Sequence, residues 1–259
     1  GDNDYWYFGK DTDGDGIEDT PKTPEDYGRP VVDWRDIMFR NAFSQQYNLS
    51  VRTSVGRGTN ILASLGYLDQ QGLIVNNGYT KLTAKVKVDH EINSKVKVGV
   101  NANYARTRSS GAATSSGGAF SGYGMTQMIY LEKPLERFED PADANSSYTA
   151  FTSIYDCISE ESSRTGISDK LMGNAYFNWN IIKDLTLRVY ASGSMSSATN
   201  NEFYSAKTRW GRSNNGVAMS SNSNSYGVNA NATLTYKHIW KRKHNFDAMV
   251  GGELSDYGY

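Results

Sequence analysis

The sequence predicts an all-β protein: an antiparallel segment of about eight strands from a larger transmembrane β-barrel, with short periplasmic turns and long extracellular loops. Three observations lead to this prediction. Apolar and polar side chains alternate in eight segments, several of which reach the roughly 9 to 11 residues that a spanning strand needs. Short and long connections alternate along the chain, and aromatic residues lie near the segment ends.

The composition excludes several classes of protein. The 259 residues include 28 acidic and 27 basic side chains, so a polyanion such as nucleic acid is not an expected partner. Cys157 is the single cysteine, which excludes a disulfide framework within the chain. No apolar run reaches the roughly 18 residues of a membrane helix. The 25 Gly and 18 Tyr, together with abundant Ser, Thr and Asn, favour strands.

The alternation is clearest in residues 81–89, where Leu82, Val86 and Val88 alternate with lysines. Because successive side chains of a strand point to opposite faces, one face of this segment is apolar and the other is charged. The other alternating segments are 47–55, 61–67, 95–104, 171–179, 185–191, 228–236 and 246–254. The polar face of a barrel wall would line an aqueous lumen. The basic candidates for that lining are Arg52, Lys85, Lys87, Lys97, Arg188 and Lys237.

The connections divide into two kinds. "GRGT", "EINSK", "IIKD" and "WKRKH" are tight, whereas residues 69–80, 108–168 and 206–222 form longer loops. Aromatic candidates for the two interface girdles are Tyr67, Tyr104, Trp179, Tyr236 and Trp240. A soluble β-sandwich or propeller also alternates, but sandwich strands commonly run only about 5 or 6 residues. Segment length therefore favours the membrane barrel. Eight strands could close a small barrel, but the pattern runs to the last residues, so we expect part of a larger one.

An acidic loop, "DTDGDGIEDTPK", precedes the first strand. Its oxygen ligands match early positions of a calcium loop: the carboxylates of Asp11, Asp13, Asp15 and Asp19 and the carbonyl of Ile17. Lys22 occupies the twelfth position, where an EF-hand has a bidentate Glu, so a true EF-hand is not expected. The loop is either a separate Ca²⁺ site or a solvated acidic turn. We assign residues 1–42 to an extracellular segment that contains it.

The chain carries no recognisable catalytic motif: it lacks a nucleophile elbow, a P-loop and a dinucleotide fingerprint, and we expect no enzyme. The loop aromatics Phe120, Tyr123 and Tyr130 either stack on a sugar or peptide or pack beneath their own loop.

Specific motifs add to the pattern. The stretch "DWRDIMFRNAFSQQYNLSVRTSVGRGTNILASLGYLDQQGLI", residues 33–74, resembles the SusC/RagA family of TonB-dependent outer-membrane transporters. The shared elements are Asp33-Trp34, Phe39-Arg40, "QxxNLSV" and "SLGYLDQxG". "KLTAKVKVDHEINSKVKVGVNANYARTRSSG", "NAYFNWNIIKDLTLRV" and "HNFDAMVGGE" resemble later hairpins, so the similarity runs over most of residues 33–259. Leu82 departs from the family, which more often has arginine there.

The resemblance implies TonB-dependent import of oligosaccharide or peptide nutrients across the bacterial outer membrane. Its expected partners are outer-membrane lipid, a SusD-like surface lipoprotein, and TonB, which would act through an N-terminal segment that this sequence lacks. Residues 43–259 would form part of the barrel, without the plug domain. The alternatives are a passive porin and a secreted, calcium-stabilised β protein that binds glycans.

Overall fold

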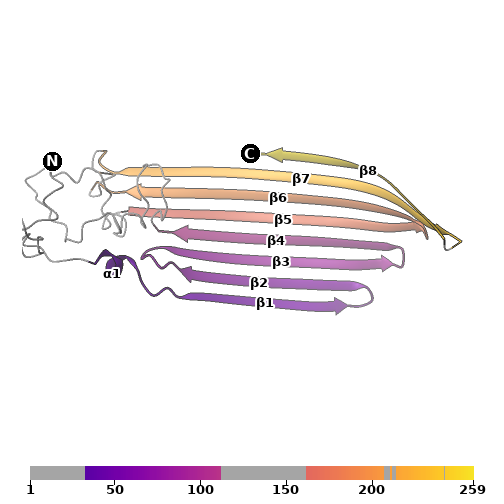
Figure 1. The fold of residues 1–259 in the computed structure, drawn as a ribbon, viewed down its shortest axis with the longest axis horizontal. Helices are drawn as coiled ribbons and strands as arrows, with labels where there is room; N and C mark the ends of the chain where they lie inside the picture. Colours follow the sequence, from indigo (N-terminus) through magenta and orange to yellow (C-terminus); the bar gives the residue numbers. More distant parts are fainter. Residues whose placement is uncertain (1–32, 112–161, 207–210, 212–213, 242) are drawn as a thin grey trace, which may run out of the picture.

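The computed structural model describes residues 33–111, 162–206, 211, 214–241 and 243–259. Its named elements are a short helix and eight strands: α1 (Trp34–Met38), β1 (Ser44–Val55), β2 (Thr59–Gln71), β3 (Gly78–Asn93), β4 (Val96–Ser110), β5 (Ser162–Ile182), β6 (Leu185–Tyr204), β7 (Val217–Trp240) and β8 (His244–Gly258). The strands form one sheet in the order β1-β2-β3-β4-β5-β6-β7-β8, and every neighbouring pair is antiparallel. The predicted antiparallel meander is therefore confirmed (Figure 1).

The strand register turns the alternation of each segment into two coherent faces. Residues directly opposite each other in an antiparallel pair share a face. One such row crosses β4 to β8 through Val100, Ala175, Ala191, Ala230 and Leu254. The next row crosses the same strands through Asn101, Asn174, Ser192, Asn229 and Ser255. We call these the apolar face and the polar face of the sheet.

The apolar face meets no second layer of protein within the described residues. The buried apolar side chains of the described part are Trp34, Met38 and Ile74, which lie beside the sheet and not on that face. On the apolar face, Val100 is 57% exposed and Leu254 is 78% exposed. A soluble sandwich would cover such side chains with a facing sheet. Here a single-layer wall leaves them open to the surrounding medium.

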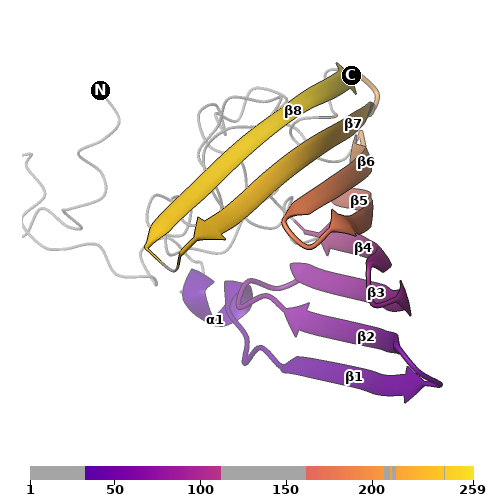
Figure 2. The same ribbon diagram turned by 90° about the vertical axis from the view of Figure 1, so that its right-hand side faces the viewer.

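The polar face is the inner side of a curved sheet. Figure 2, seen from the end of the short turns, shows the strands arranged in an arc. On β7, Ser225, Asn229 and Asn231 of the polar face are half-buried, whereas Tyr226, Val228 and Ala232 of the apolar face are exposed. Side chains converge on the concave side of an arc and spread apart on the convex side. The difference in exposure therefore assigns the polar residues to the concave side.

The short turns lie together at one end of the sheet (Figure 1). In the β1–β2 turn, Gly56 and Gly58 have φ of 60° and 94°, a region that glycine adopts at little cost. In the β3–β4 turn, the Asn93 side chain accepts hydrogen bonds from the backbone N–H of Lys95 (2.9 Å) and Val96 (3.0 Å). Such an Asx turn replaces ladder bonds that the reversal removes.

At the opposite end, α1 fastens the β2–β3 connection. Met38 is fully buried, Trp34 is 4% exposed and Ile74 is 5% exposed. Backbone hydrogen bonds join the same two segments: Arg40 N–H donates to Leu73 O (2.8 Å), and Val75 N–H donates to Met38 O (2.9 Å). We call α1, residues 39–40 and residues 71–78 the rim clamp.

Asp33 and Arg40 complete the rim clamp with polar contacts. The Asp33 carboxylate caps α1 by accepting from Arg35 N–H (2.9 Å) and the Arg35 guanidinium (2.7 Å). These bonds lower the pKa of Asp33 to about 2, so the cap is charged above about pH 4 and is lost as the pH falls through about 2. The Arg40 guanidinium donates to Gly72 O (3.1 Å) and Asn77 O (3.0 Å). The Asp-Trp and Phe-Arg motifs thus have structural roles.

Several strand ends differ from the sequence prediction. The loop expected at residues 69–80 is only the connection between Gln71 and Gly78, because β2 and β3 pair to that point. β5 and β7 likewise begin earlier than their apolar alternation, at Ser162 and Val217. These extensions are mostly polar, with a few apolar residues such as Ile167 and Met219, and do not alternate regularly, so the pattern gives no signal there. None of the described helical residues forms a helix long and apolar enough to cross a membrane.

Candidate transport surface

All six basic residues predicted to line a lumen lie on the polar face. Arg52 and Lys87 lie in the same row as Asn101 of the polar face, through the pairings Arg52↔Leu62, Leu62↔Lys87 and Lys87↔Asn101. The same rows and the period of two place the remainder there: Lys85, Lys97, Arg188 and Lys237. The structure therefore brings these six cations onto one surface, while their contact with a cargo stays a prediction.

Three of the six are held in ion pairs on that face. Lys87 Nζ lies 2.7 Å from Asp89 Oδ2, and Lys97 Nζ lies 2.6 Å from Glu91 Oε1. Lys237 Nζ lies 2.8 Å from Asp247 Oδ2 across the β7–β8 pair. Such half-exposed pairs contribute little stability but cancel local charge. The wall is therefore richer in hydrogen-bonding groups than in net positive charge.

A tyrosine lies across the polar face beside one of these pairs. The Tyr176 hydroxyl donates to Asp89 Oδ1 (2.8 Å), and its ring covers Gly99, whose missing Cβ would lie 2.2 Å from Tyr176 Cε1. Glycine at this position is needed for the close approach. On β6, the Arg188 guanidinium lies 5.9 Å from the centroid of the Tyr190 ring. Sequence reasoning missed Tyr176 and Tyr190 as site residues, because it sought aromatics only at strand ends and in loops.

Aromatic belts border the apolar face at two levels. Toward the long connections, Tyr47 pairs with Tyr67, and Tyr104 occupies the row that includes Tyr226 on β7. Toward the short turns, Tyr236, His238, Trp240 and Phe246 pack together with ring centroids 4.6–6.2 Å apart. On β7 the band between the two levels is residues 226–236, which matches the roughly 9 to 11 residues of a spanning strand. All five predicted girdle residues lie on the apolar face.

The level of Tyr67 and Tyr104 is not the end of the strands. β4 continues to Ser110 and β5 begins at Ser162, beyond the row that holds Tyr104. The first polar groups beyond the belt include Asp169, which accepts from the Tyr104 hydroxyl (2.5 Å), and Arg106, 3.7 Å from the same carboxylate. The sheet thus projects past the apolar band at the end of the long connections.

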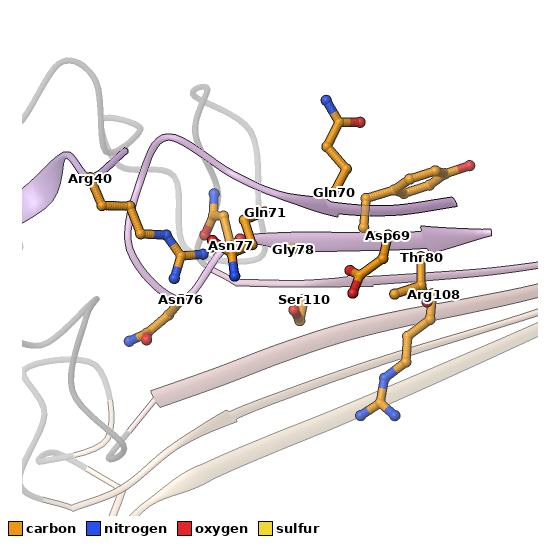
Figure 3. A pocket seen from close by; sticks show the side chains of 11 residues that line it. Arg40, Asp69, Gln70, Gln71, Asn76, Asn77, Gly78, Thr80, Arg108 and Ser110 are labelled. Carbon is orange, nitrogen blue, oxygen red and sulfur yellow. Dashed lines mark hydrogen bonds between the residues drawn. The ribbon is translucent and has the colours of Figure 1, made fainter. Parts of the chain in front are cut away.

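A polar pocket of about 380 Å³ lies in this projecting region, beside the rim clamp. Figure 3 shows the Arg40 guanidinium pointing toward Asn77, whereas the Arg108 guanidinium points away from the other labelled side chains. The Arg40 guanidinium already donates hydrogen bonds to the carbonyls of Gly72 and Asn77, so it holds the β2–β3 connection in place. The pocket thus lies between the rim clamp and the projecting ends of β2, β3 and β4. The Phe-Arg motif was the one sequence signal for it.

Two groups of predicted site residues lie outside the described part of the chain. These are the calcium candidates Asp11, Asp13, Asp15, Ile17 and Asp19, and the loop aromatics Phe120, Tyr123 and Tyr130. Within the described ranges no group of three or more His, Cys, Asp or Glu side chains is placed to hold a metal ion.

Comparison with known proteins agrees with this architecture. No family model matches the chain. The chain is 26% identical over 264 residues to the TonB-dependent receptor SusC of Bacteroides thetaiotaomicron, a match that covers 90% of this chain and 25% of that protein. The chain therefore spans about a quarter of the length of this curated relative.

The fold is that of solved transporter barrels. A structure of the RagAB peptide transporter matches 89% of this chain and 26% of its own with a TM-score of 0.69 and 19% identity. The open-open state of the RagAB peptide importer matches 88% of this chain and 25% of its own with a TM-score of 0.70 and 21% identity. The expected outer-membrane location is confirmed by these likenesses. By sequence the chain is similar to SusC and by fold to the RagAB barrels, so the predicted SusC/RagA resemblance is confirmed.

Proposed function

We propose that the full protein imports an oligosaccharide or peptide nutrient across the bacterial outer membrane in a TonB-dependent manner. The observation that carries the proposal is the single-layer sheet, with an exposed apolar face and a concave polar face, in a chain related to SusC. Lipid can cover the apolar face, while the polar face can line a water-filled passage. The described residues contribute a wall to this passage.

The chemistry of the polar face suits a cargo that forms hydrogen bonds and carries little net charge. Ion pairs neutralise Lys87, Lys97 and Lys237, and amides and hydroxyls fill the rows between them. Tyr176 and Tyr190 add flat surfaces of the kind on which sugar rings and peptide side chains pack. Oligosaccharide and peptide both fit these properties, and the choice between them stays open.

The proposed partners follow from the same relatives. A SusD-like surface lipoprotein would lie over the long extracellular connections, and TonB would act from the periplasm through an N-terminal segment of the full protein. The acidic loop at Asp11–Asp19 would bind Ca²⁺ on the extracellular side, where its carboxylates would otherwise repel one another.

Genetic uptake experiments test this proposal. A strain that depends on the full gene for growth on one oligosaccharide or oligopeptide source should lose that growth completely when TonB is removed, because the plug of such a transporter opens only when energy is supplied. The strain with an intact tonB gene is the control. Growth that persists without TonB would contradict the proposal and favour the passive porin. A full-length protein that stays folded in water without detergent would favour the secreted glycan-binding alternative.

A further inference from the structure

Every short turn of the sheet carries an exposed basic residue. Arg57 lies in the β1–β2 turn, Lys95 in the β3–β4 turn, Lys183 in the β5–β6 turn, and Lys241 and Lys243 in the β7–β8 turn. Because all four turns lie at one end of the sheet, these five cations form a row along a single edge of the wall (Figure 1). We call this row the cationic rim.

The cationic rim is not neutralised by the part of the chain that the structure describes. None of its five charges takes part in an ion pair with another described residue, in contrast to Lys87, Lys97 and Lys237 on the polar face. Asp184 is the acidic residue of the described turns, and its carboxylate lies 2.8 Å from His238 Nδ1. The edge therefore keeps an excess of positive charge that an external group can bind.

The neighbouring aromatic belt sets the depth of the cationic rim. Tyr236, His238, Trp240 and Phe246 form the end of the apolar face nearest to these turns. Aromatic belts of this kind lie at the level of lipid headgroups, where the apolar part of each ring faces the acyl chains and the polar part faces water. Cations one turn beyond the belt are therefore at the height of headgroup phosphates.

The β7–β8 turn keeps a basic residue at a backbone position that does not favour it. Lys241, in the three-residue connection between Trp240 and His244, has a φ of 50°, in the left-handed region where Gly and Asn are preferred. The turn is closed by a hydrogen bond from Lys243 N–H to Trp240 O (3.0 Å). Asn would adopt this backbone conformation with less strain, so turn geometry does not explain the lysine at this position.

We propose that the cationic rim binds the phosphates of anionic phospholipids in the periplasmic leaflet of the outer membrane. Each headgroup phosphate would lie against one or two of the five cations while its acyl chains cover the adjacent apolar face. The site would fix the depth and tilt of the wall in the membrane by charge as well as by hydrophobic match. It rests on the outer-membrane location and would hold for any cargo.

Native mass spectrometry of the full-length protein tests the cationic rim. Purified protein in a neutral detergent is incubated with phosphatidylglycerol or with phosphatidylcholine that has the same acyl chains. The wild-type protein should retain several-fold more phosphatidylglycerol. The variant R57Q/K95Q/K183Q/K241Q/K243Q should lose this preference, with the ratio of the two lipids falling by about tenfold or more, since each basic residue near an anionic surface adds substantially to binding.

A matched variant separates the cationic rim from net charge. The register also places Lys81 and Lys170 on the polar face, opposite Thr107 and Ala105. R52Q/K81Q/K85Q/K170Q/R188Q therefore removes five positive charges from the polar face and should retain the wild-type preference. K241N relieves the strained turn, so it should unfold no more readily than the wild type and still bind phosphatidylglycerol about two- to fivefold less tightly. Equal loss of preference in both five-site variants would overturn the proposal. So would a wild-type protein that shows no lipid preference but binds an acidic peptide at the same turns.

Discussion

Replacing Ala191 with arginine should lower the stability of the full-length barrel in lipid by about 2–4 kcal/mol, because Ala191 lies at mid-height of the apolar face, between Ala175 and Ala230. The side chain at this position is exposed in the sheet, so an arginine meets no protein atoms that it would have to displace. Its cost comes from moving a charge into hydrocarbon. Reversible unfolding in guanidinium in the presence of lipid vesicles would measure the difference.

Ser194→Arg is the matched control for this change. Ser194 is also small, exposed and in β6, but it lies on the polar face. Its replacement should change stability by no more than about 0.5 kcal/mol, as is usual for water-exposed positions. Equal and small effects at both positions would show that water covers both faces, which contradicts a lipid-facing wall.

Replacing Met38 with alanine should release the rim clamp. Met38 is fully buried, and truncation of a buried methionine commonly costs about 2–5 kcal/mol because a cavity remains. The rim clamp is small and lies at one end of the sheet, so we expect local opening and no loss of the barrel. Hydrogen exchange should accelerate at the amides of Arg40 and Val75, which bond to Leu73 O and Met38 O across the contact.

Leu73→Ala provides the control within the same segment. Leu73 is 65% exposed, so its truncation removes no buried contact and should leave those two amides protected. If Met38→Ala also leaves exchange unchanged, the clamp is not held by its apolar core. The hydrogen bonds of Arg40 would then carry the contact alone.

The strand interiors could be predicted because one physical signal determines them. Where a strand separates lipid from water, each side chain must suit its own side, so residues 81–89 or 228–236 show their period directly. The register then follows, since a slip by one residue would exchange the two faces. Beyond the aromatic belt both faces meet water, and segments such as the start of β7 lose the signal although pairing continues.

The parts that could not be predicted depend on contacts between distant residues. The burial of Met38 and its backbone bond with Val75 give α1 its place, but five residues are too few for a helical period to show. The pairing of Tyr176 with Asp89 needs the register of three strands and the absence of a side chain at Gly99. The alternation within single strands predicted the six cations of the polar face. It could not predict which of these cations would be neutralised by ion pairs.

Site-directed spin labelling of β7 tests most directly whether lipid and water meet opposite faces. Nitroxides are placed one at a time at residues 226–236 of the full-length protein, in a background whose native cysteines, Cys157 included, are replaced by serine, and the protein is reconstituted in bilayers. Even-numbered positions should be accessible to molecular oxygen, which concentrates in lipid, and odd-numbered positions to a water-soluble nickel complex, with a period of two throughout. A profile without that alternation, or even-numbered positions shielded from oxygen, would contradict a wall that separates lipid from an aqueous passage.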